Sequence, residues 1–218
     1  ELSMMGKPFI YGEGSDYVQF RNLNITNGNS HGIQLVDCDH TLVAGCDFTN
    51  LGQRAVVIGT ISTAYENINT GANGGHDNLV QSCNILRVGQ GGVYLGGGDR
   101  YTLTNGNNRV DNCDFEDFST VKRTYSPAVA LVGCGNQVTR SRMHNAPHMA
   151  ISYDGNNHLI QGNEIFNVCY ETSDVGAIYS VRTWSYRGVV INNNYIHDLT
   201  TSHGTGSAAV YLDDMTSG

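Results

Sequence analysis

The sequence predicts an all-β fold, a right-handed parallel β-helix of about seven rungs. Three observations predict it: a strand pattern that recurs along the chain, a second alternating segment after each recurrence, and Asn- and Gly-rich turns between them. No stretch of ten or more residues keeps a helical period. At about 4.8 Å between neighbouring strands, seven rungs would make a solenoid about 34 Å long.

The first strand pattern begins and ends with an apolar residue and carries polar or small residues between. It occurs at residues 20–25, 43–48, 80–85, 110–115, 138–143, 160–165 and 191–196. The closest starts, 138 and 160, are 22 residues apart, and the wider spacings imply loops of variable length. A sandwich would show hairpin turns between adjacent strands, so this recurrence favours a pectate-lyase-like solenoid.

Each first pattern is followed by a short segment of period two, as at Gly32–Leu35, Gly92–Leu95 and Ala177–Ser180. Alternation sends Ile178 and its equivalents inward. The residues just before them, such as Gly32 and Ala177, then form an outward row of the smallest side chains. Tyrosines lie beside that row, so we expect a groove for a sugar ring along the whole coil, unless a loop covers it.

The six cysteines are expected to be buried free thiols. Cys46, Cys83 and Cys113 occupy one column of the repeat, where stacked Cβ atoms lie about 4.8 Å apart, wider than the mean of about 3.8 Å in a disulfide. No Cys-x-x-Cys pair occurs, so a zinc knot is not expected. The predicted interior is a stack of small or hydrogen-bonding side chains at this corner.

Charge and composition exclude several partners. The formal net charge is −8, from 12 Lys and Arg against 20 Asp and Glu, so neither a nucleic acid nor an anionic membrane surface is an expected partner. Charged residues make up only 15% of the chain. A polar surface rich in Asn, Ser, Thr and Tyr suits a neutral carbohydrate substrate, and no obligate protein partner is predicted.

Carboxylates beside the predicted groove point to glycoside hydrolysis, which needs one carboxylic acid and one carboxylate acting as base or nucleophile. Asp174 opens the second strand of one rung, while Asp213 and Asp214 close that of the next. These three aspartates are the predicted catalytic residues. Parity favours Asp213 over Asp214 as the one facing the groove, and the wider, inverting separation is expected.

Six further residues are predicted to bind substrate. Three insertions, at residues 117–126, 169–175 and 199–207, fall at one corner and bring polar groups to one rim of the groove. Pro147 and the strand that begins at Met149 argue against a helix that would pair His144 with His148 as metal ligands. By parity His148 points outward near the groove, so it is predicted to be a substrate contact or proton shuttle. The predicted substrate-binding residues are Glu171, His148, Tyr179, Arg182, Trp184 and Tyr211.

The second half of the chain resembles bacterial β-helix proteins of glycoside hydrolase family 141 and its uncharacterised relatives. The resemblance covers residues 89–218 and is carried by GGVYLGGGDR at 91–100, KRTYSPA at 122–128, HNAPHMAI at 144–151, GNNH at 155–158, NEIFNVC at 163–169, ETSDVGAIY at 171–179 and YLDDMTSG at 211–218. It implies hydrolysis of fucosides or xylan-like glycans of plant or algal type. It also implies that Asp174, Asp213 and Asp214 are the matching acids.

One departure bears on activity. The usual Gly-Arg-Asp-Trp of that family appears here as Val181-Arg-Thr-Trp184, so that an acidic position is Thr183. This loss favours one alternative, a non-catalytic glycan-binding or structural β-helix. A polysaccharide lyase or uronate epimerase on the same coil also stays open as an alternative. No metal or cofactor is expected, apart from calcium if the chain is a lyase.

The chain is expected to be one β-helix domain over residues 1–218, and a fragment of a longer protein, because neither end carries a capping element. No signal peptide is visible at Glu1. Because its expected substrate is a polysaccharide, the protein is nonetheless expected to be secreted and to act outside the cell or in the periplasm.

Overall fold

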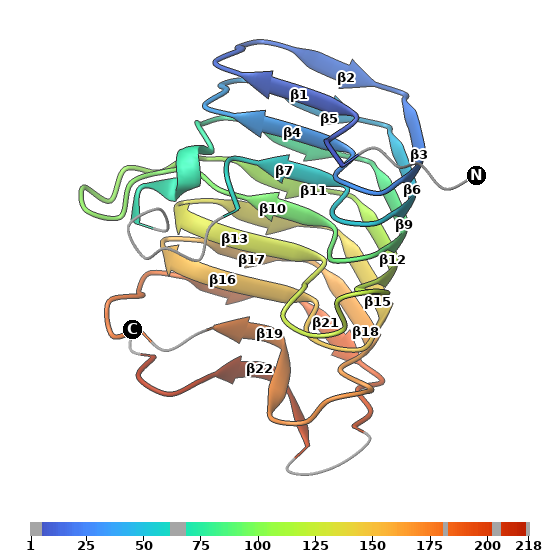
Figure 1. The fold of residues 1–218 in the computed structure, drawn as a ribbon. Helices are drawn as coiled ribbons and strands as arrows, with labels where there is room; N and C mark the ends of the chain where they lie inside the picture. The colour runs from blue at the N-terminus through green and yellow to red at the C-terminus, as the bar shows by residue number, and fades with distance from the viewer. Residues whose placement is uncertain (1–5, 62–68, 181–182, 202–205, 217–218) are drawn as a thin grey trace.

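The computed structural model describes residues 6–61, 69–180, 183–201 and 206–216. The chain winds as a coil of three parallel sheets that descends from the N-terminus to the C-terminus (Figure 1). Every pairing between the named strands is parallel, as predicted. Within the described residues, no helix has the length and hydropathy needed to cross a membrane.

Sheet A contains eight strands. They are β1 (Ile10–Glu13), β4 (Ile33–Val36), β7 (Val56–Ile58), β10 (Val93–Leu95), β13 (Val129–Cys134), β16 (Ile151–Asn156), β19 (Val175–Ser180) and β22 (Ser207–Leu212). They pair in that order. This sheet is the predicted second strand of each rung, preceded by one additional strand, β1.

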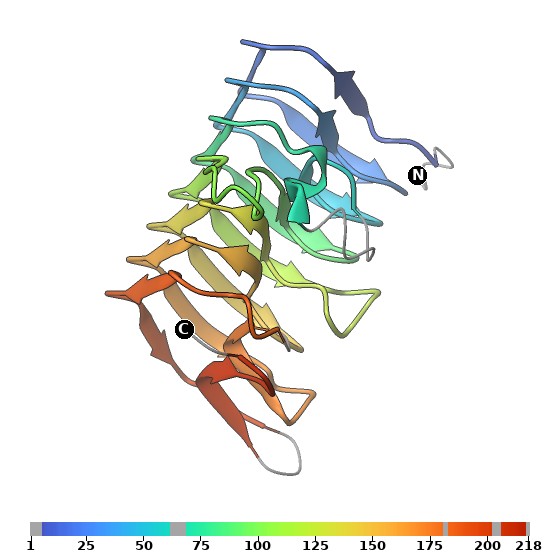
Figure 2. The ribbon, with the colours of Figure 1, turned by 90° about the vertical axis from the view of Figure 1, so that its left-hand side faces the viewer.

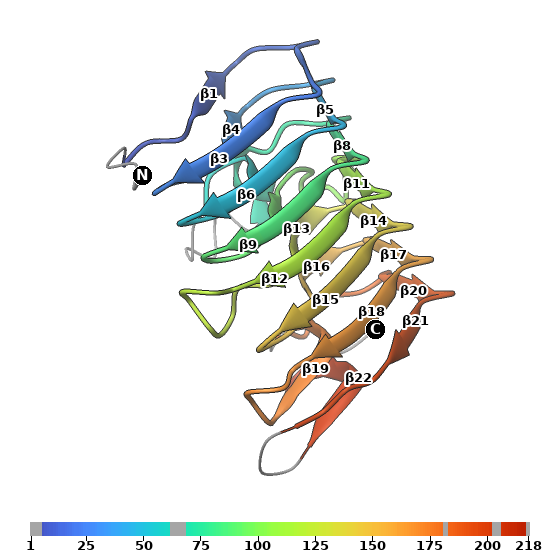
Figure 3. The same ribbon diagram turned by 90° about the vertical axis from the view of Figure 1, so that its right-hand side faces the viewer.

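Sheets B and C contain seven strands each. Sheet B contains β2 (Gln19–Arg21), β5 (Leu42–Ala44), β8 (Leu79–Gln81), β11 (Arg109–Asp111), β14 (Gln137–Thr139), β17 (Leu159–Gln161) and β20 (Val190–Asn192). Sheet C, facing the viewer in Figure 3, contains β3 (Asn24–Gly28), β6 (Asp47–Leu51), β9 (Asn84–Val88), β12 (Asp114–Phe118), β15 (Arg142–Ala146), β18 (Glu164–Val168) and β21 (Tyr195–His197).

The predicted first strand is in fact two strands separated by a corner. At residues 20–25, β2 ends at Arg21 and β3 begins at Asn24. Asn22 between them has a φ of 53°, in the left-handed region that asparagine tolerates, and this turns the chain from sheet B into sheet C. The two-strand rung predicted from the repeat is therefore a three-strand rung.

A hydrogen-bonded ladder lines this corner on the inside. The backbone N–H of Cys113 donates to Ser141 Oγ at 3.1 Å, that of Ser141 to Asn163 Oδ1 at 3.0 Å, and that of Asn163 to Asn194 Oδ1 at 3.0 Å. All six cysteines are buried free thiols, as predicted. Side chains of this column thus satisfy backbone donors that the turn leaves without a strand partner.

The row of small residues in front of sheet A is buried from Gly32 to Ala177, which corrects the predicted outward row, and only its last member, Ala209 of β22, is exposed. Ala55, Ala128, Ala150 and Ala177 are fully buried in the main apolar cluster. A Cβ on Gly92 would lie 2.4 Å from the Phe115 ring, so the large residues of sheet C fill the space beside the small ones. Ala55, Ala128 and Ala150 stand at the corner just before a strand begins, where strict alternation does not apply, whereas Ala177 lies inside β19 and is buried all the same.

The predicted groove is also shorter than the coil. In the N-terminal half, the outward residues Val57, Tyr94 and Ala130 are buried in a second apolar cluster with Ala72. Ala72 belongs to a short 3₁₀ helix, η1 (Gly71–Asn73), which lies in front of the coils in Figure 2. The outer face of sheet A is therefore covered over β7, β10 and β13, which separates the exposed Tyr11 of β1 from the accessible C-terminal strands.

Candidate functional site

The candidate site lies on the outer face of sheet A, over β16, β19 and β22. Ser152, Tyr179 and Tyr211 share one outward row, in register across the three strands. Tyr153 of β16 pairs with Ser180 of β19, and Ser180 pairs with Leu212 of β22. Asp154 directly follows Tyr153, and Asp213 directly follows Leu212. Two strand spacings therefore separate the backbones of the two aspartates, about 10 Å.

A pocket of about 150 Å³ opens beside Asp154. Its lining comes from β16 and β19 of sheet A, from Met149 just before β16, and from the loop that joins β12 to β13, one of the predicted insertions. The lining residues are Tyr125, Pro127, Met149, Ser152, Tyr153, Asp154 and Tyr179. The pocket thus combines one carboxyl group with several aromatic rings, a lining that suits a sugar.

Asp154 is half-buried, and burial raises the pKa of its carboxyl group to about 6. Tyr186 Oη donates to Asp154 Oδ1 at 3.5 Å, and the positive charge of Arg100 also favours the carboxylate, but burial outweighs both. A carboxyl group that titrates near pH 6 keeps part of its proton near neutrality. It can therefore act as a general acid.

Arg100 holds the segment that carries Ser185 and Tyr186. Its guanidinium lies 4.5 Å from the centre of the Tyr186 ring and donates to Asn156 Oδ1 and Ser185 Oγ, both at 2.8 Å. Asn156 in turn donates to the carbonyl of Ser185 at 2.8 Å. This network holds Tyr186, only 3% exposed, against Asp154.

Asp213 is the second carboxyl group of the site. It is 8% exposed, and Tyr179 Oη donates to its Oδ2 at 2.5 Å. The backbone N–H of Asp214 donates to Asp213 Oδ1 at 2.7 Å, so both carboxylate oxygens accept a hydrogen bond. Tyr179 lines the pocket beside Asp154 and binds Asp213, and so links the two acids.

Asp174 is exposed and lies at the start of β19, where Tyr211 Oη donates to its Oδ1 at 2.8 Å. The ring of Tyr211 meets that of Tyr179 edge to face, with centroids 5.7 Å apart. This hydrogen bond to Asp174 raises the pKa of Tyr211, and the charges of Asp213 and Asp214 raise it further. All three predicted acids therefore surround one phenol, Tyr211.

Glycine makes this approach of Tyr211 to the start of β19 feasible. A Cβ on Gly176 would lie 2.6 Å from the Cβ of Tyr211. A shallow depression of about 350 Å³ lies alongside, lined by Asp174, Val175, Gly206, Ser207, Ala208 and Tyr211. Asp174 therefore lies on the rim of this depression, where it accepts the hydrogen bond of Tyr211.

The other predicted binding residues are placed differently. Glu171 is exposed on the rim and paired with Arg123, which lowers the pKa of the Glu171 carboxyl group. His148 is 5% exposed beneath the Tyr125 ring, and burial lowers its pKa to about 4, so it is a neutral imidazole at pH 7. Trp184 is 70% exposed, and Arg182 lies outside the described residues.

Sequence reasoning did not select Asp154, Tyr186 or Arg100 as site residues. The alternation of β16 could have identified Asp154, because it puts this residue in the same outward row as Asp213, two rungs away. The contact between Tyr186 and Asp154 joins residues 32 positions apart and has no such signal. Among the described residues, the one group spaced to share a metal ion lies elsewhere, at His40, His76 and Asp77.

One family model and one solved structure agree with this architecture. The family model for the right-handed beta helix region matches residues 9–117, half of the chain. An alginate lyase structure from Paenibacillus sp. str. FPU-7 aligns with a TM-score of 0.56 and 13% identity, over 95% of this chain and 78% of the lyase chain. A trypsin-treated variant of QnrB1, a plasmid-mediated fluoroquinolone resistance protein, aligns with a TM-score of 0.30 and 13% identity, over 96% and 92%. No curated protein matches the chain.

Proposed function

The chain belongs to the right-handed β-helix family, and from this premise we propose that it is a glycoside hydrolase with its active site on the outer face of sheet A. Asp154 acts as the general acid and Asp213 as the base. The observation that carries the proposal is the pair itself: a carboxyl group with a pKa of about 6 and a carboxylate two rungs away, joined through Tyr179.

The roles follow from the two environments. Asp154 is partly desolvated, and burial outweighs the charge of Arg100, so it retains a proton for the leaving glycosidic oxygen. Asp213 accepts a hydrogen bond on each oxygen, from Tyr179 and from the backbone N–H of Asp214, which hold its carboxyl group in place as the proposed base. An inverting reaction needs a water molecule between base and sugar, with carboxyl groups about 6.5–9.5 Å apart. The backbones of Asp154 and Asp213 lie two strand spacings apart, about 10 Å, which permits side chains at such a separation.

The remaining acids are proposed to bind sugar hydroxyl groups. Asp174 and Asp214 are exposed beside Tyr211, where their oxygens accept hydrogen bonds from a neutral glycan. The negative charge gathered here disfavours a polyanionic substrate. A xylan-like or fucoside substrate, suggested by the resemblance to glycoside hydrolase family 141, agrees with this. A polymeric substrate would be met outside the cytoplasm.

A polysaccharide lyase is the second candidate, because tyrosines line the pocket and the similar solved structure is an alginate lyase. A lyase needs a base for the proton next to a uronate carboxylate and a group that neutralises that carboxylate. Burial raises the pKa of Tyr153, which makes it a poor base at neutral pH, and Arg100 is already engaged by Asn156 and Ser185. Hydrolysis therefore fits the pocket better.

A substrate panel tests the proposal. The purified chain is incubated with xylan, fucosylated oligosaccharides and alginate, and both new reducing ends and the absorbance of unsaturated uronides are measured. We expect reducing ends from a neutral glycan without unsaturated product, and a decrease of about 10²- to 10⁴-fold in Asp213→Asn. The matched control is Asp198→Asn, whose carboxyl group lies just after β21 of sheet C with a 79% exposed side chain.

Unsaturated product from alginate would contradict hydrolysis and identify the chain as a lyase. Absence of any product on all three substrates would favour a non-catalytic glycan-binding β-helix, consistent with Thr183 at an acidic position of the resembling family.

A further inference from the structure

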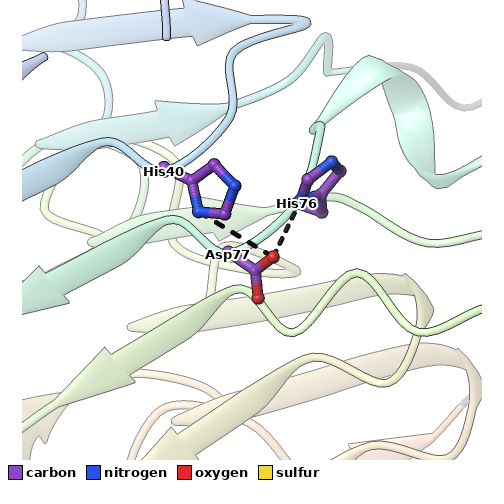
Figure 4. A group of neighbouring side chains, drawn as sticks. All are labelled: His40, His76 and Asp77. Atoms are coloured by element: carbon purple, nitrogen blue, oxygen red, sulfur yellow. Dashed lines mark hydrogen bonds and ion pairs between the residues drawn. The ribbon is translucent and has the colours of Figure 1, made fainter. Parts of the chain in front are cut away.

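A cluster of imidazole and carboxylate groups lies at the corner between sheets A and B, on two successive rungs (Figure 4). Asp39 and His40 stand in the turn from β4 to β5, and His76 and Asp77 stand in the segment from η1 to β8. The two dipeptides have opposite order, Asp-His above His-Asp. Each histidine therefore faces an aspartate on the neighbouring rung.

The spacing of the donor atoms suits a shared metal ion. His76 Nδ1 lies 2.9 Å and His40 Nδ1 lies 4.0 Å from Asp77 Oδ2, and the ligand atoms of these three residues all lie within 4.8 Å of one another. A tetrahedral ion with bonds of about 2.0–2.1 Å separates its ligand atoms by roughly 3.4 Å, between the observed values. Small side-chain rotations would therefore complete the set.

Asp39 supplies the outer partner that a metal-bound histidine needs. His76 Nε2 lies 2.9 Å from Asp39 Oδ2. If Nε2 carries the proton and donates it to this carboxylate, Nδ1 presents its lone pair toward His40 and Asp77. Histidine ligands in metal sites are commonly held in this way by a carboxylate on the other nitrogen.

The backbone around the cluster is held in place. The N–H of His40 donates to the His76 carbonyl at 3.0 Å, and that of His76 donates to Asp39 Oδ1 at 2.8 Å. His40 and Asp77 have φ values of 54° and 57°, equivalent positions in successive turns. The Tyr17 ring stacks on His40 with centroids 4.7 Å apart. Little ordering is left for a ligand to impose.

We propose that His40, His76 and Asp77 bind a divalent transition-metal ion of the zinc class, with Asp39 as the positioning residue for His76. Two imidazoles and one carboxylate are ligands that Zn²⁺ and Co²⁺ accept, whereas Ca²⁺ and Mg²⁺ prefer oxygen alone. The side chains are 38–50% exposed, so water can occupy the fourth position. The bound ion would cross-link two rungs at the surface. From the sequence, no metal was expected.

Titration of the chelator-treated chain with Co²⁺, followed by its visible absorption, tests the site. We expect one ion per chain, displaced by Zn²⁺, with the d–d bands of nitrogen and oxygen ligands and no thiolate charge-transfer band. Asp39→Asn should weaken binding about 10- to 100-fold. His40→Asn and Asp77→Asn should weaken it more, and asparagine tolerates the left-handed backbone at both positions.

His197→Asn is the matched control, because His197 Nδ1 also lies 2.9 Å from an aspartate, Asp198, outside the three-ligand group. Its affinity for Co²⁺ should equal that of the wild type. Circular dichroism confirms that each variant is folded. Absence of saturable binding, a thiolate charge-transfer band, or unchanged affinity in both His40→Asn and Asp77→Asn would overturn the proposal.

Discussion

Asp154→Asn is expected to lower kcat/KM by about 10²- to 10⁴-fold on the glycan that the wild-type chain hydrolyses, while the coil stays folded. Asparagine has nearly the same shape and still accepts the hydrogen bond of Tyr186, but it has no proton to give to the leaving oxygen. Steady-state kinetics measures the decrease. Asp114→Asn, the same change at a strand of sheet C, should leave the rate unchanged.

The pKa of Asp154 also sets the pH dependence. Its folded value of about 6 exceeds the ordinary value of 3.8, so the folded protein holds this proton over a pH range in which the unfolded chain has lost it. The contribution of this group to stability is therefore greatest below pH 3.8 and is lost as pH rises to about 6. Activity that needs the protonated acid should likewise decline above about pH 6.

Two results would contradict this role. Asp154→Asn with activity within about twofold of wild type would exclude Asp154 as the acid, since a general acid contributes about 10²-fold or more. Loss of activity in Asp174→Asn together with retained activity in Asp154→Asn would assign the proton donor to the rim beside Tyr211 instead.

Ile178→Asp is expected to unfold the chain. Ile178 is fully buried in β19, between Ile151 of β16 and Val210 of β22. A carboxylate here would have no cation and no water, and burying an unpaired charge costs several kcal/mol or more. Urea unfolding followed by circular dichroism should find no cooperative transition at neutral pH.

The matched control is Ile178→Val, which removes one methylene and should cost only about 0.5–1.5 kcal/mol. A cooperative transition in Ile178→Asp at a urea midpoint close to that of the control would contradict the inward placement of this column.

The fold was predictable from the sequence because the repeat combines two independent periods. Alternation selects one face of each strand, and the spacing of the repeat stacks equivalent residues such as Cys83 and Cys113 on one another. Both patterns come from local geometry. The corners were less predictable, since a left-handed residue such as Asn22 turns the chain at a point that strand alternation does not reveal. The burial of Ala177, predicted to point outward, was likewise not predicted by alternation.

The candidate site was predictable only in part. Tyr179, Tyr211, Asp174 and Asp213 lie together as alternation and rung order imply. The depth of the pocket depends on which loops fold over sheet A, and strand periodicity carries no information about that. The loop residue Tyr125 covers His148, and the desolvation that raises the pKa of Asp154 likewise arises from tertiary packing.

A crystal structure of Asp154→Asn soaked with a hydrolysable oligosaccharide tests the central claim most directly. A sugar bound over the outer face of sheet A is expected, in contact with Tyr179 and with its glycosidic oxygen beside position 154, on the opposite side from Asp213. A sugar bound on sheet B or sheet C, away from Tyr179, would contradict it.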